Sequence, residues 1–147
     1  MKSVMRVTVA APYERVFRLA ADIERWPEIL PHYRYVRRLA DVGEDRQYAM
    51  GARRGMIPVS WKAIQRPLPD DRRIEFEHTG GVTRGMVVAW HFEPVGEAWH
   101  VSIHHELDLR WPLIGRVVAD RIVGPQFIDA IAGRTLRTIK RLAESSA

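Results

Sequence analysis

The chain has 147 residues, which suits a single domain that buries a hydrophobic core. Hydrophobic residues make up 46% and charged residues 28%, which excludes wholesale disorder, and no apolar run approaches the roughly 18 residues of a membrane span. The 23 Lys and Arg residues outnumber the 18 Asp and Glu residues, and the net charge of +5 permits contact with a phosphate-rich partner. The absence of cysteine excludes disulfides, thiolate metal sites and cysteine nucleophiles.

The N-terminal part predicts one strand followed by two short helices. Residues 3–10 alternate polar and apolar side chains, as a strand with one buried face does. They lack the apolar block of a signal peptide, so we expect a cytoplasmic protein. Pro12 suits the first position of a helix that continues to residue 20, and Asp22 suits the N-cap of a second helical turn over residues 23–26.

From residue 33 onward, turn signals recur at the spacing typical of an antiparallel meander. If Gly96-Glu97 forms a type II′ turn with glycine first, Phe92 faces Val101 and Trp90 faces Ile103, which matches the apolar alternation on both strands. No repeat or linker interrupts the chain, so we expect one domain over residues 1–147. The predicted strands span residues 35–42, 46–53, 57–65, 72–79, 83–94 and 98–109.

Residues 114–144 predict two helical pieces joined at Gly124-Pro125. In the second piece the apolar residues recur at three- and four-residue spacing, so they form one stripe that must pack against another element. The strands offer the large partner. We therefore predict an α+β helix-grip arrangement, in which a curved antiparallel sheet of about seven strands wraps around a long C-terminal helix. The stripe consists of Phe127, Ile128, Ile131, Ala132, Ile139 and Leu142.

Strand parity assigns a concave face that is rich in aromatic and sulfur-containing side chains and carries no arginine. One helix need not fill the concavity of such a sheet, so we predict an amphipathic cavity between sheet and helix, with Trp26 and Trp111 near its entrance. Tyr48, His78 and His105 would supply its polar groups. The predicted ligand-contacting residues are Tyr48, Met50, Val59, Trp61, Phe76, His78, Met86, Val88, Trp90, Ile103, His105, Phe127 and Ile131.

Two segments carry a resemblance to a known family: residues 9–17 (VAAPYERVF) and 21–31 (ADIERWPEILP), together with Gly124-Pro125 and the helix that follows. With the order of the elements, they resemble the helix-grip fold of the START-like superfamily, which includes plant Bet v 1-type proteins. Within it, the chain is similar to the polyketide cyclase/dehydrase and coenzyme Q-binding family over essentially its whole length.

This resemblance implies a monomer or homodimer that binds a hydrophobic small molecule, such as a lipid, quinone, sterol or polyketide, with the terminal helix as a lid. Family members that act as aromatase/cyclases orient a poly-β-ketone with polar groups on the concave wall, commonly including an arginine. The predicted concave face has no arginine, which favours binding or transport over cyclisation.

Three alternatives remain open at this stage. His78 and His105 are weak candidates for general acid–base catalysis of a cyclisation or dehydration, although a histidine on an apolar face is usually a core residue. His91, His100 and His104 share the outer face and are weak candidates for a zinc or nickel site, but no fourth ligand is evident, so we expect neither metal nor cofactor. The basic surface is an alternative site for a ribosome or another RNA.

Overall fold

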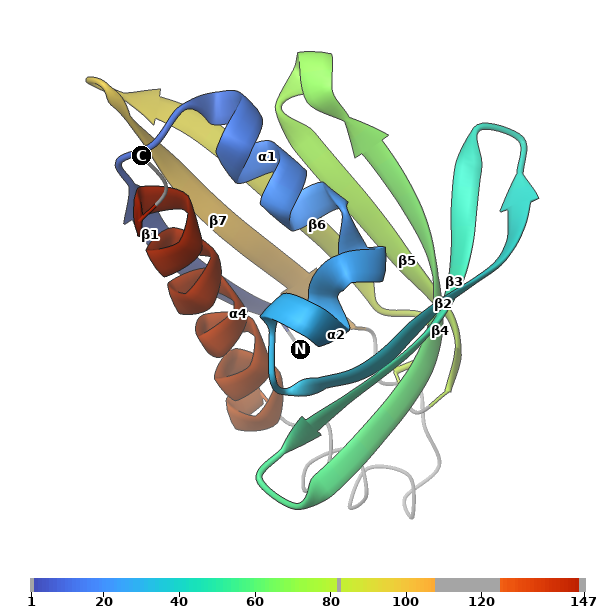
Figure 1. Ribbon diagram of the computed structural model, residues 1–147. Coiled ribbons are helices and arrows are strands. Elements are labelled where there is room, and N and C mark those ends of the chain that lie inside the picture. Colours follow the sequence, from blue (N-terminus) through green and yellow to red (C-terminus); the bar gives the residue numbers. More distant parts are fainter. Residues whose placement is uncertain (1, 82, 108–124, 146–147) are drawn as a thin grey trace.

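The computed structural model describes residues 2–81, 83–107 and 125–145, which form a curved sheet with helices on its concave side (Figure 1). The described strands are β1 (Lys2–Val9), β2 (Tyr33–Val42), β3 (Asp45–Arg54), β4 (Ile57–Leu68), β5 (Arg73–Gly81), β6 (Val87–Val95) and β7 (Ala98–Glu106). The described helices are α1 (Tyr13–Ala21), α2 (Trp26–Ile29) and α4 (Pro125–Ser145), with 3-10 turns η1 (Ile23–Arg25) and η2 (Pro69–Asp71).

The seven described strands form one antiparallel sheet in the order β1-β7-β6-β5-β4-β3-β2. Strand β1, the first in the chain, pairs with β7, the last. The curved sheet wraps around α4, while α1 and α2 cover the rest of the concave side (Figure 1). This is the helix-grip fold that the sequence predicts. The predicted helical piece over residues 114–123, Trp111 and Leu109 lie outside the described residues.

The β6–β7 hairpin has the predicted register. Phe92 pairs with Val101 and Trp90 with Ile103. Gly96 has φ +60°, whereas Glu97 is not among the residues with positive φ, as a type II′ turn requires. Turn chemistry and apolar alternation therefore determine which side chains of these two strands face the interior.

Three local expectations need correction. Strand β6 begins at Val87 rather than at residue 83, because the N–H of Met86 donates to the carbonyl of Thr83 (2.9 Å) and closes a turn. Pro12 occupies the N-cap of α1, one position before the predicted one. Asp22 is the N-cap of η1, but its side chain makes no capping hydrogen bond.

Helix α4 buries Ile128, Ala132 and Ile139 of its predicted stripe, half-buries Ile131 and Leu142, and leaves its arginines in solvent. Arg134 and Arg137 are both exposed. Each fully buried aliphatic side chain contributes about 1.5–3 kcal/mol relative to its exposed state, so this stripe holds the helix in place. The side chain of Phe127 is outside the described part of the structure.

Candidate functional site

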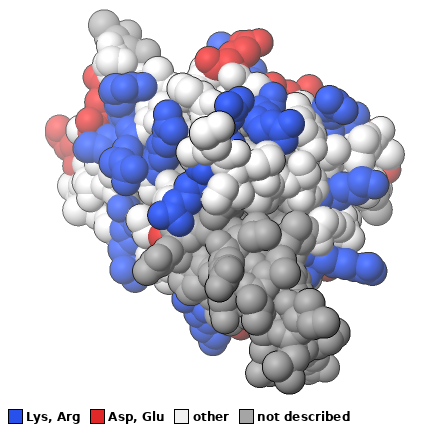
Figure 2. Space-filling view, turned by 90° about the horizontal axis from the view of Figure 1, so that it is seen from below, with Lys and Arg blue, Asp and Glu red and all other residues white. Residues whose placement is uncertain are grey.

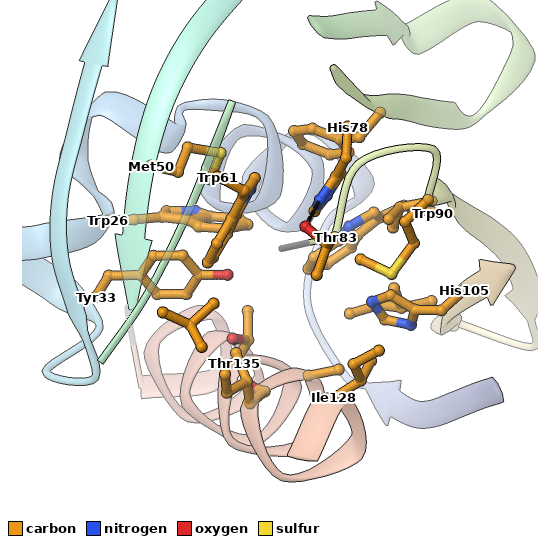
Figure 3. A pocket seen from close by; sticks show the side chains of 17 residues that line it. Trp26, Tyr33, Met50, Trp61, His78, Thr83, Trp90, His105, Ile128 and Thr135 are labelled. Atoms are coloured by element: carbon orange, nitrogen blue, oxygen red, sulfur yellow. Dashed lines mark hydrogen bonds between the residues drawn. The ribbon is translucent and has the colours of Figure 1, made fainter. Parts of the chain in front are cut away.

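A cavity of about 80 Å³ lies between the concave face of the sheet and α4 (Figure 3). Its wall combines side chains from the central strands with one face of α4 and with residues from the start of β2. The residues that line it are Trp26, Tyr33, Met50, Val59, Trp61, Phe76, His78, Thr83, Met86, Val88, Trp90, Ile103, His105, Ile128, Ile131, Ala132 and Thr135.

Most of the predicted ligand-contacting side chains line this wall: Met50, Val59, Trp61, Phe76, His78, Met86, Val88, Trp90, Ile103, His105 and Ile131. Tyr48 is an exception. It is buried but does not line the cavity, because its hydroxyl donates to Glu24 Oε1 (3.2 Å) near the short helices. Whether the wall residues contact a ligand stays a prediction.

Sequence reasoning missed several polar groups of the wall. Thr135 follows Ile131 by one helical turn, so it has the spacing of the predicted stripe. The stripe is defined by apolar residues, however, and threonine carries a hydroxyl group. Thr83 reaches the wall from the turn after β5, which the sequence predicts as part of a strand. Tyr33 begins β2 ahead of a register shift, so simple alternation could not assign its direction. Trp26, expected at the entrance, is part of the wall.

His78 is held by two neighbours within the wall. Its ring stacks on the Trp61 indole, with ring centroids 5.5 Å apart and an interplanar angle of 5°. Its Nδ1 lies 2.6 Å from the Thr83 hydroxyl oxygen, and the dashed line in Figure 3 marks this hydrogen bond. Burial, with a smaller contribution from His105, lowers the pKa of His78 to about 3. The ring is therefore neutral at pH 7.

His105 lies on the same sheet face, on β7 between Ser3 of β1 and Val88 of β6. Burial lowers the pKa of His105 to about 4, although the charge of Asp129 acts in the opposite direction. Its buried Nδ1 has no hydrogen-bond partner in the described part of the chain, and neither has the buried indole N–H of Trp61. Such unpaired groups cost about 1–3 kcal/mol each, so both are available to a polar group that enters the cavity.

Thr135 connects α4 to His32 and Tyr33. The Thr135 hydroxyl donates to the Ile131 carbonyl (2.8 Å), so its oxygen accepts from the Nε2–H of His32 (2.8 Å). Burial lowers the pKa of His32 to about 4 and raises the pKa of Tyr33. The Tyr33 hydroxyl points toward the cavity (Figure 3).

The described residues of the cavity wall are mostly apolar, and they are uncharged at neutral pH. None of the described residues that line it is an arginine, lysine or carboxylate, and its histidines are neutral. An ionised ligand group would lose its hydration here without gaining a counter-charge. The wall therefore suits a molecule that is mostly apolar and carries neutral polar atoms.

The outer-face histidines do not form a metal centre. The rings of His91 and His104 lie 4.7 Å apart, whereas His100 Nδ1 lies 3.4 Å from the Thr8 hydroxyl oxygen across the β1–β7 pairing. Throughout the described ranges, no three His, Asp or Glu side chains converge as metal ligands do. Among the same residues, no helix combines the length and apolar character that crossing a membrane requires.

The fold and the cavity agree with a comparison of the sequence with known families. The model of the family described as polyketide cyclase / dehydrase and lipid transport matches residues 9–124. The chain belongs to this family. Membership supports a role in hydrophobic ligand binding or in cyclisation.

Known relatives include an enzyme and solved structures of the same fold. The granaticin polyketide synthase bifunctional cyclase/dehydratase of Streptomyces violaceoruber is 31% identical over 98 residues, which cover 65% of this chain but 30% of that protein. The Zhui aromatase/cyclase from Streptomyces sp. R1128 has a TM-score of 0.79 at 19% identity and covers 98% of this chain and 93% of its own. A START superfamily protein from Mycobacterium smegmatis has a TM-score of 0.76 at 15% identity, covering 97% of each chain.

Proposed function

We propose that this protein binds a flat, largely apolar molecule that carries carbonyl or hydroxyl groups, of the polyketide or quinone class, between the sheet and α4. One observation carries the proposal: the indole N–H of Trp61 and Nδ1 of His105 are buried and unpaired in a wall that is mostly apolar and uncharged. Buried polar groups in native proteins are usually paired, so these two indicate a missing polar partner.

The chemistry of these groups restricts the ligand. An indole N–H only donates, so its partner must be an acceptor such as a carbonyl oxygen. The neutral ring of His105 offers a donor on one nitrogen and an acceptor on the other. Trp90 and Phe76 supply apolar contact area between these two polar points. A rigid ring system with oxygen atoms at its edge satisfies both requirements.

The cavity must widen to accept such a molecule. Its volume is about 80 Å³, whereas ligand sites of proteins usually measure about 300–1,000 Å³. Met50 and Met86 are flexible wall residues that can repack at low cost. We therefore expect ligand binding to include a displacement of wall side chains.

The first experiment searches for the ligand and tests the indole contact. Native mass spectrometry of the purified protein, followed by thermal shift with quinones and aromatic polyketides, should identify a bound molecule. Trp61→Phe keeps an aromatic ring but removes the donor, and should weaken binding up to about tenfold. Trp99→Phe is the matched control because Trp99 does not line the cavity. No bound mass and no thermal shift across the panel would contradict the proposal.

A second candidate function is cyclisation or dehydration of a poly-β-ketone in the same cavity. It is favoured by the position of His105, whose unpaired nitrogen can accept a proton from a bound substrate. With a pKa of about 4, however, the ring is a weak base, and its protonated form is too rare at pH 7 for acid catalysis. Equal turnover of a poly-β-ketone by wild type and His105→Gln would exclude this role.

A further inference from the structure

We propose that the end of the molecule formed by the β3–β4 and β5–β6 turns docks on the surface of an anionic lipid bilayer. The apolar part of this surface is the pair Met56 and Ile57 in the β3–β4 turn, and the cationic part is Arg53, Arg54 and Arg84. We call these five residues the turn surface. The proposal goes beyond the proposed function, because it concerns the partner of the outer surface and not the content of the cavity.

The apolar residues of the turn surface are unusually exposed. Met56 is 97% and Ile57 48% accessible to solvent. Gly55 has φ +58°, which closes the β3–β4 turn tightly, so the two side chains that follow stand at its tip. Nothing in the described structure covers them. Exposed apolar side chains at a projecting tip are the kind that insert into the boundary between lipid headgroups and acyl chains.

The arginines of the turn surface are exposed, and no carboxylate of the described ranges compensates their charge. Arg53 and Arg54 precede the tip, and Arg84 lies in the β5–β6 turn. Among the described residues, none of the three forms an ion pair with a carboxylate. Each arginine near an anionic lipid surface strengthens binding about fivefold. Their positive charge therefore complements such a surface.

The two turns lie at the same end of the molecule. Strand β4 begins at Ile57 beside the first turn and pairs at Trp61 with Gly81, where β5 ends before the second turn. Figure 1 places both turns at the lower end, and Figure 2 shows that Lys and Arg predominate over Asp and Glu on the face seen from below. A planar partner can thus contact both turns at once.

The turn surface is also continuous with the cavity wall. Ile57, Val59 and Trp61 alternate along β4, so they share one face of the strand, and the last two line the cavity. This apolar row leads from the tip inward. A lipid surface explains both the apolar tip and the charge, whereas an RNA would use the arginines and leave Met56 and Ile57 in water.

Vesicle co-sedimentation of the full chain tests the proposal. We expect binding to vesicles that contain phosphatidylglycerol and much weaker binding to vesicles of phosphatidylcholine alone. Met56→Ser with Ile57→Ser should reduce binding more than tenfold, because it removes the inserted apolar area. Arg53→Ala and Arg54→Ala should each reduce it about fivefold.

Two control variants come from the opposite end of the molecule. Val95, at the β6–β7 turn, is 54% exposed, so Val95→Ser removes a comparably exposed apolar side chain. Arg46 is exposed at the other end of strand β3 from Arg54, about 26 Å away at roughly 3.3 Å per residue. We expect Val95→Ser and Arg46→Ala to bind vesicles like the wild type.

The cysteine-free sequence permits a direct test of insertion. An environment-sensitive fluorophore on Met56→Cys should shift to shorter wavelength on anionic vesicles, and the same label on Val95→Cys should not. The proposal is wrong if the chain does not bind these vesicles at low salt, or if the turn variants bind as the wild type does. Binding to homopolymer RNA without binding to vesicles would likewise overturn it.

Discussion

At the scale of single residues, burial keeps three histidines neutral around the cavity. His78, His105 and His32 all have depressed pKa values, and loss of hydration is the largest cause in each case. They differ in their surroundings: His78 and His32 each bond to a threonine, and His32 and His105 each have one nitrogen that is unpaired among the described residues, but His105 lines the cavity and His32 does not. The same residue type is thus structural at two positions and available for a ligand at the third.

The bond between Thr135 and His32 can be tested with an isosteric change. Thr135→Val keeps the shape but removes the acceptor of the His32 Nε2–H, so a buried donor is left unpaired. We expect a loss of about 1–3 kcal/mol in the free energy of unfolding, measured by urea denaturation. Thr138→Val is the control, because among the described residues its hydroxyl bonds only to the Arg134 carbonyl of the same helix. Equal effects of the two changes would show that the His32 bond contributes nothing.

The depressed histidine pKa values predict a loss of stability on mild acidification. Each ring takes up a proton near pH 6.5 in the unfolded chain but only near pH 4 or below in the folded protein. The unfolded state therefore binds more protons between these values, and the free energy of unfolding must fall as pH decreases from 6.5 toward 4. Urea denaturation at several pH values from 7.5 to 5 measures this slope.

Two carboxylates with partners in the fold do not contribute to the change of stability between pH 7.5 and 5. The pKa values of Asp45 and Glu144 are lowered by their partners, so these carboxylates remain ionised throughout the range from pH 7.5 to 5. His105→Gln should reduce the slope. A free energy of unfolding that does not change between pH 7.5 and 5 would mean that the three rings are not buried in solution as they are in this structure.

At the scale of elements, turns determine which residues reach the cavity. The β6–β7 turn fixes a register that directs Trp90 and Ile103 inward. The end of β5 depends on Gly81, whose φ is +90° and whose close neighbours are Ser60 and Trp61 of β4. The turn that follows brings Thr83 to His78. A change at Gly81 should therefore disturb both the sheet and one wall of the cavity.

Gly81→Ala tests this role of the turn. A Cβ at this position would lie 2.5 Å from the Ser60 carbonyl oxygen and 2.8 Å from the Trp61 Cα, both of them backbone atoms that cannot easily move. We expect a loss of at least about 2 kcal/mol in the free energy of unfolding. At Gly43, with φ +65° and no atom within 4 Å, the same change should cost only about 1 kcal/mol. Thermal unfolding of the two variants measures the decrease in their midpoint temperatures. Similar decreases for Gly81→Ala and Gly43→Ala would refute the argument from close packing.

At the scale of the whole molecule, the sheet wraps around α4 and the fit between them sets the volume of the cavity. Ala132 and Thr135 bring short side chains to the wall at its centre, whereas Ile128 and Ile131 fill more space. The free space therefore depends on a small residue in α4 opposite the large side chains Trp61 and Trp90. A change at Ala132 can therefore affect both ligand affinity and the stability of the fold.

Ala132→Val should separate these two properties. Its added methyl groups occupy part of a cavity of about 80 Å³, so ligand affinity should fall more than tenfold, while the free energy of unfolding changes by less than about 1 kcal/mol. Ala130→Val has the same effect on helix propensity but does not line the cavity, so it should bind ligand normally. Titration calorimetry with the molecule found by mass spectrometry measures the affinity of both variants, and urea denaturation measures their free energies of unfolding. Undiminished affinity in Ala132→Val would place the ligand elsewhere.

Local signals in the sequence predict much of this architecture. Alternation along each strand and the Gly96-Glu97 turn determine which side chains face inward, because these signals act between residues close in the chain. They correctly direct Trp61, His78 and His105 to the interior. Of the segments that carry the family resemblance, residues 9–17 and 21–31 lie within the match of the family model, whereas the helix after Gly124 lies beyond it.

Only the tertiary structure decides what the interior contains. Tyr48 faces inward as parity requires, yet its hydroxyl meets Glu24 from a short helix, and no local pattern encodes that meeting. Thr135 joins the wall because α4 packs against His32, which lies 103 positions earlier in the chain. The volume of the cavity and its unpaired groups depend on such contacts between distant segments, which form only when the sheet closes around the helix.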